Sequence, residues 1–158
     1  MSKSITERTV GNKAMKIVIT VLAVFGITHT SLAQAHEEMI EARQNAFSNI
    51  ENQTKVVNKQ VKKSDIDWQA MLAASEQLTV DSTMLSNAFE TGSQEGSKAK
   101  ESVWTKPEKF NRLLAEMQQG YKQVAEGVDK QSIDEVKRGL KVAESTCKSC
   151  HRSYRSRW

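Results

Sequence analysis

Hydrophobic residues in this chain recur at alternating steps of three and four, the spacing that places them along one face of an α-helix. The pattern predicts helices over about residues 37–61, 65–89, 107–128 and 132–154. Ser64 is the expected N-cap of the second helix, and Pro107 suits the first turn of the third. No segment shows the strict alternation of a β-strand, so we expect an all-α protein.

The connections between the predicted helices indicate how the helices are arranged. Residues 62–64 and 128–131 are short connections, which make the helices on either side antiparallel neighbours, whereas residues 90–105 form a long one. A chain of 158 residues is enough for one domain with a single helical core. We therefore expect an antiparallel up-down-up-down four-helix bundle.

The first 35 residues differ from the rest of the chain. Lys13 and Lys16 precede an uninterrupted apolar run, Ile17–Ile27, and the segment ends in Ala33-Gln34-Ala35. This is the pattern of a cleavable secretory signal peptide. An uncleaved membrane anchor is the weaker alternative, because the run is well short of the roughly 20 residues that span a bilayer. We expect residues 1–35 to be a signal peptide and residues 36–158 to be a periplasmic helical domain.

Net charge argues against two classes of partner. The whole chain carries a formal charge of +4, and removal of residues 1–35, with four basic residues and one acidic residue, lowers it to +1. A mature domain so close to neutrality has no electrostatic basis for binding nucleic acid or anionic lipid. We expect no nucleic-acid partner and no stable membrane insertion after cleavage of the signal.

The segment Cys147-Lys148-Ser149-Cys150-His151 contains the only two cysteines of the chain and the only one of its three histidines that follows residue 36. Two thiols at this spacing add to the two vinyl groups of a haem, and an imidazole directly after the second thiol reaches the iron. On a helix, all three side chains project from one face. The sequence therefore predicts one covalently bound haem c, attached through Cys147 and Cys150, with His151 as an iron ligand.

Three other roles for the same segment are weaker. A thiol redox site is expected near a βαβ pattern, which this sequence lacks. A structural zinc site needs four ligands, and the segment offers three crowded ones. A plain disulfide across one helical turn would leave His151 without a role.

The mature chain resembles the class II c-type cytochromes, and in particular the cytochrome c′ family. The resemblance covers the four helices, the attachment of haem near the C-terminus, and three local motifs. The motifs are Ile40–Phe47, which contains an Arg-Gln pair, Val103-Trp104 with Phe110, and Cys147–Arg155. The resemblance implies a four-helix bundle that encloses the haem.

By this resemblance, Phe47 is the residue that faces the open side of the iron. A methionine there would supply a sixth ligand and a phenylalanine cannot, so the resemblance implies a five-coordinate, high-spin iron in an apolar pocket. It also implies that Arg43 and Gln44 lie near the haem propionates and that Arg155 lies near the imidazole of His151. The alternatives are a core role for Phe47, a solvated helix edge for Arg43 and Gln44, and an ordinary exposed charge for Arg155.

Two functional hypotheses are open. The first is a non-enzymatic periplasmic haem protein that binds nitric oxide and carbon monoxide at a crowded iron and also transfers electrons to an unidentified redox partner. The second is a low-spin, six-coordinate electron carrier, which would need a sixth ligand from Met39, Met71, Met117 or His36. The resemblance further implies that the chain can form a homodimer.

Overall fold

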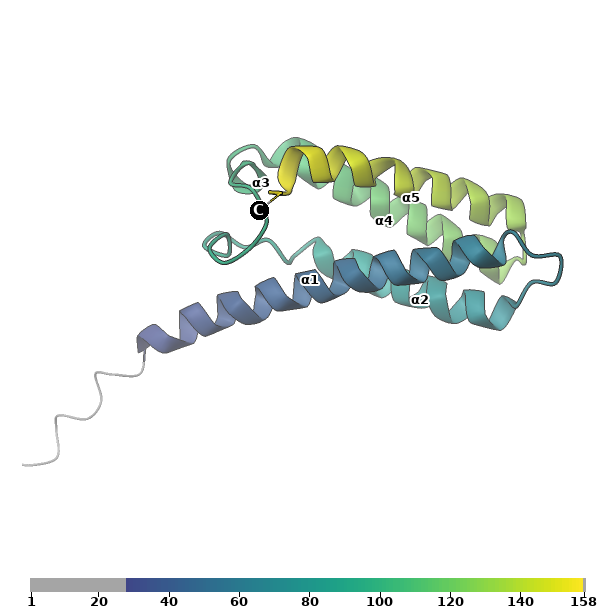
Figure 1. Cartoon of the computed structure of the whole chain (residues 1–158), viewed down its shortest axis with the longest axis horizontal. Helices are drawn as coiled ribbons and strands as arrows, with labels where there is room; N and C mark the ends of the chain where they lie inside the picture. Colours follow the sequence, from purple (N-terminus) through teal and green to yellow (C-terminus); the bar gives the residue numbers. More distant parts are fainter. Residues whose placement is uncertain (1–27, 158) are drawn as a thin grey trace, which may run out of the picture. The chain divides into compact units, whose positions relative to one another are not determined.

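The computed structural model describes residues 28–157 and contains four long α-helices and one short one (Figure 1). Among these residues there is no β-strand, only one isolated bridge between Ala99 and Arg155. The predicted all-α bundle of four antiparallel helices is confirmed. The helices are α1 (Thr28–Gln60), α2 (Trp68–Leu85), α3 (Ser102–Thr105), α4 (Pro107–Asp129) and α5 (Ile133–Tyr154).

The chain divides into two compact units, residues 1–33 and residues 34–158, and the bundle lies in the second. The apolar run Ile17–Ile27 of the predicted signal peptide lies outside the described residues, so the signal and its cleavage site stay predictions. In the part of the chain that the structure describes, no helix has the length and hydropathy needed to cross a membrane.

Local capping explains where α2 begins. Asp67, rather than the predicted Ser64, is its N-cap, and the Asp67 carboxylate accepts a hydrogen bond from the backbone N–H of Ala70 at 2.9 Å. The side-chain oxygen of Gln60 accepts the N–H of Asp67 at 3.3 Å and holds the α1–α2 connection in a shape that delays the start of α2. The prediction of Ser64 as the cap is therefore wrong.

Other helix limits also differ from the predictions. α1 begins at Thr28, before the expected residue 37, and α2 ends at Leu85, before the expected residue 89. Pro107 lies in the first turn of α4, as predicted. The long connection between α2 and α4 contains the single turn of α3.

Three glycines bring the backbones of α4 and α5 into contact. A Cβ on Gly120 would lie 2.5 Å from the backbone nitrogen of Ala143, and one on Gly139 would lie 2.6 Å from that of Val124. A Cβ on Gly127 would meet the nitrogen of Val136 at 2.7 Å. Glycine inside a helix costs about 1 kcal/mol relative to alanine. The close approach of α4 and α5 nevertheless requires glycine at these positions, because any side chain would force the two helices apart.

The hydrophobic core extends from this glycine interface toward α2 and α1. Apolar side chains on the inner faces of the four long helices are buried, as their spacing in the sequence predicts. α2 and α4 share much of this core. The largest apolar side chains that are fully buried are Val57, Met71, Leu78, Leu85, Tyr121, Val124 and Val136.

The α2–α4 connection is tied to the end of α5. The backbone N–H of Lys100 donates to the carbonyl of Tyr154, and that of Ser156 donates to the carbonyl of Lys98, both at 2.8 Å. The isolated bridge between Ala99 and Arg155 lies between these two bonds. Residues 98–100 are therefore held against the C-terminal end of α5, at one end of the bundle (Figure 1).

Candidate functional site

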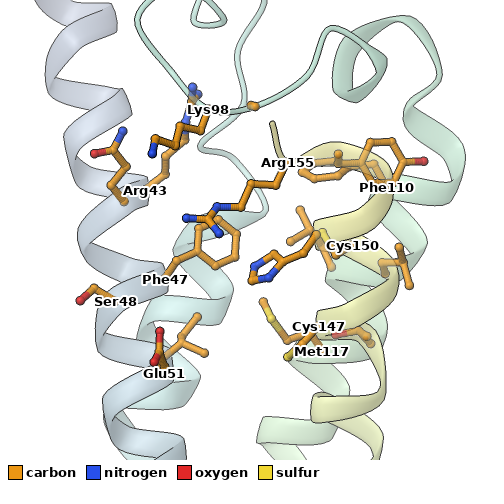
Figure 2. Close-up of a pocket in the computed structure, with 18 of the residues that line it drawn as sticks. Arg43, Phe47, Ser48, Glu51, Lys98, Phe110, Met117, Cys147, Cys150 and Arg155 are labelled. Carbon is orange, nitrogen blue, oxygen red and sulfur yellow. The ribbon is translucent and has the colours of Figure 1, made fainter. Parts of the chain in front are cut away.

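A cavity of about 730 Å³ lies between α1 on one side and α4 and α5 on the other (Figure 2). Its volume is within the range of roughly 300–1,000 Å³ that is usual for ligand and cofactor pockets. The α2–α4 connection closes one end of it. Most of its lining is apolar, and the buried part of the wall includes Ile50, Val103, Phe110, Leu113, Leu114, Met117 and Tyr121.

Cys147, Cys150 and His151 all line this cavity, from the last two turns of α5. The α-helix continues without interruption through the segment, so the three side chains project from one face, as the sequence predicts. Both thiols are free, and His151 is exposed toward the open space. The arrangement leaves the two sulfurs and the imidazole available to one planar group in the cavity.

The environment of the two thiols does not favour thiolate chemistry. Burial, followed by the nearby Glu144 carboxylate, raises the pKa of the Cys147 thiol. Burial and the neighbouring Cys147 raise the pKa of Cys150 to about 11. Cysteines that exchange disulfides have pKa values lowered to about 3.5–7.5, so this site lacks the usual property of a thiol redox centre.

A zinc site also finds no support. Across residues 28–157, no group of three or more His, Cys, Asp or Glu side chains is arranged to hold a metal ion. A porphyrin needs no such cluster, because it brings four nitrogen ligands of its own.

Phe47 projects from α1 into the cavity, from the wall opposite α5 (Figure 2). The ring is half-buried. Other α1 residues on this wall are Arg43, Gln44, Ser48, Ile50, Glu51, Thr54, Lys55 and Asn58. None of them is a methionine, histidine or cysteine, so the α1 wall offers no thioether or imidazole to a metal at the centre of the cavity.

Of the four residues considered as a sixth ligand, only one lines the cavity. Met39, Met71 and His36 do not line the cavity. Met117 does, but it comes from α4 and not from the α1 wall.

Arg43 is buried, with 3% of its surface exposed, so the alternative of a solvated helix edge is wrong for this residue. Its guanidinium donates to the carbonyl of Ala88 at 3.1 Å and to the hydroxyl and carbonyl of Ser93 at 2.8 and 2.6 Å. Burial lowers the pKa of Arg43. The arginine ties α1 to the α2–α4 connection, a role that the sequence did not reveal because its partners lie far along the chain.

The remaining predicted residues lie at the rim of the cavity. Gln44 and Arg155 both line it and both are exposed. Arg155 extends from the end of α5 toward α1 (Figure 2). Lys98, which sequence reasoning missed, lines the same rim because the backbone bonds described above hold its segment beside Arg155.

The opposite end of the cavity is closed by polar contacts across the bundle. The hydroxyls of Thr54 on α1 and Tyr121 on α4 lie 2.9 Å apart, and the amide of Asn58 donates to Glu144 on α5 at 2.6 Å. Tyr121 is 1% exposed, and burial raises its pKa to about 12. At this end of the cavity, α1 is thus joined to α4 and α5 by direct hydrogen bonds between side chains.

The residues of this cavity fit a haem c. Two thiols and an imidazole on one helical face match the vinyl groups and iron of the porphyrin. The apolar walls match its flat faces, and the cations at the rim match its two carboxylates. When bound, haem supplies the redox and gas-binding chemistry of the iron, and the protein sets its ligands and surroundings.

Comparison with known proteins gives the same result. Residues 38–155 match the protein family described as Cytochrome C'. No curated protein matches the chain. Many solved structures match, and they share its fold.

Three of these structures illustrate the similarity in fold. Cytochrome c′ from Thermochromatium tepidum gives a TM-score of 0.68 at 18% identity, covering 77% of this chain and 96% of its own. A cytochrome c′ with an unusual ligand-controlled dimer dissociation gives 0.69 at 19%, covering 77% and 97%. The nitric oxide complex of a variant cytochrome c′ from Alcaligenes xylosoxidans gives 0.65 at 24%, covering 78% and 97%.

The family match covers most of the chain, and the cavity lies within the matched residues. Members of this family bind haem c covalently. The protein is therefore a c-type haem cytochrome, and it belongs to the cytochrome c′ family.

Proposed function

We propose that this protein binds nitric oxide and carbon monoxide at a five-coordinate, high-spin haem iron. In this proposal Cys147 and Cys150 attach the haem and His151 is its single axial ligand from the protein. The observation that carries the proposal is the composition of the α1 wall, where Phe47 projects into the cavity and no methionine or histidine is present.

Phe47 acts as a steric filter in this proposal. A phenyl ring beside the open iron position disfavours water and bulky ligands, and it donates no hydrogen bond to stabilise bound dioxygen. Small diatomic ligands that bind ferrous iron without such a bond are then preferred. Nitric oxide and carbon monoxide have this property.

The charged residues at the rim have supporting roles. We assign the haem propionates to the rim where Gln44 and Lys98 lie near Arg43, because carboxylates prefer amide and ammonium donors. The guanidinium of Arg43, which donates to Ala88 and Ser93, adds a buried positive charge beside them. Arg155, one turn beyond His151, would donate a hydrogen bond to a diatomic ligand that displaced the imidazole on the His151 side of the iron.

The similarity to a structure described as a nitric oxide complex is consistent with this proposal at the level of fold. The low-spin alternative would require Met117, which lines the cavity from α4 and not from the α1 wall, to reach the open side of the iron. We also propose electron transfer to a redox partner, which a five-coordinate iron does not prevent and which would take place through the open rim of the cavity.

Optical spectroscopy tests the proposal. The purified, haem-loaded ferrous protein is expected to show a broad high-spin spectrum, and to convert fully to new spectra when carbon monoxide or nitric oxide is added. Sharp low-spin bands that do not respond to either gas would refute it and would favour the electron carrier.

We also propose that the protein is exported to the periplasm. The N-terminal segment has the pattern of a secretory signal peptide, and covalent attachment of haem is expected to take place in that compartment. Mass spectrometry of the protein recovered from a periplasmic extract is expected to give a mature chain that begins at His36. A chain that retains residues 1–35 would count against export by cleavage.

We also propose a homodimer formed through α1 and α2. Val56 on α1 and Leu72 and Val80 on α2 are exposed, and Val80 is the most exposed of them at 62%. Sedimentation of the mature protein is expected to give a dimer, and Val80→Glu is expected to shift it to a monomer. A monomeric parent protein would contradict this part of the proposal.

A further inference from the structure

We infer that Phe89, in the α2–α4 connection, fixes the ring of Phe47 beside the open iron position and thereby sets how readily a diatomic ligand binds. The inference rests on the proposed function, since it requires Phe47 to face the iron. Its basis is a contact between the two rings: their centroids lie 6.5 Å apart at 61°, an edge-to-face arrangement that is favourable for aromatic pairs.

The ring of Phe89 is itself held by other side chains. The edge-to-face contact with Phe110 on α4 has a centroid distance of 4.7 Å. The guanidinium of Arg43 lies over the ring of Phe89 at 4.8 Å, within the range of a cation–π interaction. The ring centroids of Trp104 and Phe89 lie 6.3 Å apart. Phe89 is therefore packed against α1, α3 and α4 at once and has little freedom to move.

The backbone around Phe89 is also held. Arg43 donates to the carbonyl of Ala88 at 3.1 Å. The indole N–H of Trp104 donates to the carbonyls of Phe89 and Glu90, each at 3.0 Å. A residue outside regular secondary structure is usually free to adjust, and here its two neighbouring carbonyls and its own carbonyl all accept side-chain bonds.

These contacts have a consequence for Phe47. Phe47 lies on α1 and is the only Phe, Tyr or Trp of that helix. To turn away from the cavity centre toward the α2–α4 connection, the ring would have to occupy space that Phe89 fills. A ligand that binds the iron must displace Phe47 against this fixed neighbour. Phe89 thus affects ligand binding by fixing the position of Phe47, without lying next to the ligand itself.

Carbon monoxide association to the haem-loaded ferrous protein, followed by stopped flow, tests this. Phe89→Ala is expected to raise the association rate about tenfold, comparable to losing one good aromatic pair. Phe47→Ala is expected to raise the rate further, and Phe47→Ala combined with Phe89→Ala is expected to match Phe47→Ala alone. An unchanged rate in Phe89→Ala, or effects of the two changes that multiply, would overturn the inference.

Leu78→Ala is the matched control, because Leu78 is fully buried on α2 and does not line the cavity. It is expected to destabilise the fold without changing the rate, and a rise equal to that of Phe89→Ala would show general loosening and overturn the inference.

If Phe89→Ala does not fold, Trp104→Phe takes its place. It keeps a ring but removes the two indole bonds, and a smaller rise is expected, whereas no rise would count against the inference.

The outcomes also separate this inference from the proposed function. If the parent protein does not bind carbon monoxide, both are wrong. If the parent binds it and Phe47→Ala speeds binding while Phe89→Ala does not, the proposed function stands and the inference about Phe89 alone is wrong.

Discussion

α5 meets its two neighbours in opposite ways. Against α4 it packs backbone to backbone, because Gly120, Gly127 and Gly139 leave no room for a side chain. Toward α1 it faces a cavity of about 730 Å³, with a hydrogen bond between Asn58 and Glu144 at one end. The contact between α4 and α5 is made entirely by protein atoms. Between α1 and α5, apolar side chains instead line a cavity that a cofactor can fill.

This difference shows how the bundle divides stability from function. Close packing of α4 and α5 gives the haem-binding segment a rigid support. α1 lies across the gap and carries Phe47, and it is attached through Arg43 at one end and through Thr54 and Asn58 at the other. We expect the haem to supply the missing apolar contacts between α1 and α5. Changes on the two sides should therefore have different consequences.

The largest effect is expected when covalent attachment is removed. Replacing Cys147 and Cys150 together with Ser should leave all of the haem extractable into acidified acetone. In the haem-free variant, backbone amides of α1 between Arg43 and Asn58 should exchange with solvent faster than those of α4 and α5, because α4 and α5 keep their contact with each other when the haem is lost. Haem that stays with the variant protein would contradict covalent attachment, and uniform exchange would contradict the division of the bundle.

A change at the glycine interface should act on the other side. Gly120→Ala is expected to lower the free energy of unfolding by about 2–3 kcal/mol, measured by urea denaturation, because its Cβ would lie 2.5 Å from the backbone of Ala143. Gln119→Ala, at the exposed neighbouring position, should change it by less than about 0.5 kcal/mol. Since alanine is the better helix former, stabilisation by Gly120→Ala would show that the helices are not in contact.

A smaller effect is expected at the polar end of the cavity. The pKa of Tyr121 is raised from 10.0 to about 12, so its neutral form is favoured in the folded state. Its contribution to stability is fully present below pH 10 and is lost as pH rises from 10 to 12, by roughly 2–3 kcal/mol at most. Tyr121→Phe should lower stability by about 1 kcal/mol near neutral pH, through loss of the bond to Thr54.

The same substitution should flatten the pH dependence. Urea denaturation of the parent protein and of Tyr121→Phe at a series of pH values above 9 gives the difference that is due to this hydroxyl alone. The two stability curves are expected to converge above pH 10 and then to cross as pH approaches 12, because the parent loses more than its initial advantage. Curves that stay parallel would show that Tyr121 ionises as readily in the folded state as in the unfolded chain.

Much of the fold could be predicted from the sequence because it depends on local order. The helical period, the short connections and the spacing of Cys147, Cys150 and His151 act over one or two turns, and the structure places these three side chains on one cavity as that spacing predicts. The position of Phe47 on the cavity wall came from the resemblance rather than from spacing.

The features that were missed depend on residues far apart in the chain. Arg43 is buried because Ala88 and Ser93 supply its acceptors, and no local pattern connects these positions. Phe89 continues the spacing of Leu85 and so looked helical, but it lies beyond the end of α2 while its ring still packs into the core. The glycines of α4 and α5 reduce helix propensity when considered alone, and only the pairing of the two helices explains them.

The most direct test of the account is the optical spectrum of Phe47→Met. If Phe47 faces the open side of the iron across from His151, a methionine on the same wall places a thioether within reach of the metal. The ferrous variant is then expected to show sharp low-spin bands and weaker carbon monoxide binding than the parent protein. A high-spin spectrum identical to that of the parent would show that Phe47 does not face the iron and would contradict the proposed gas-binding site.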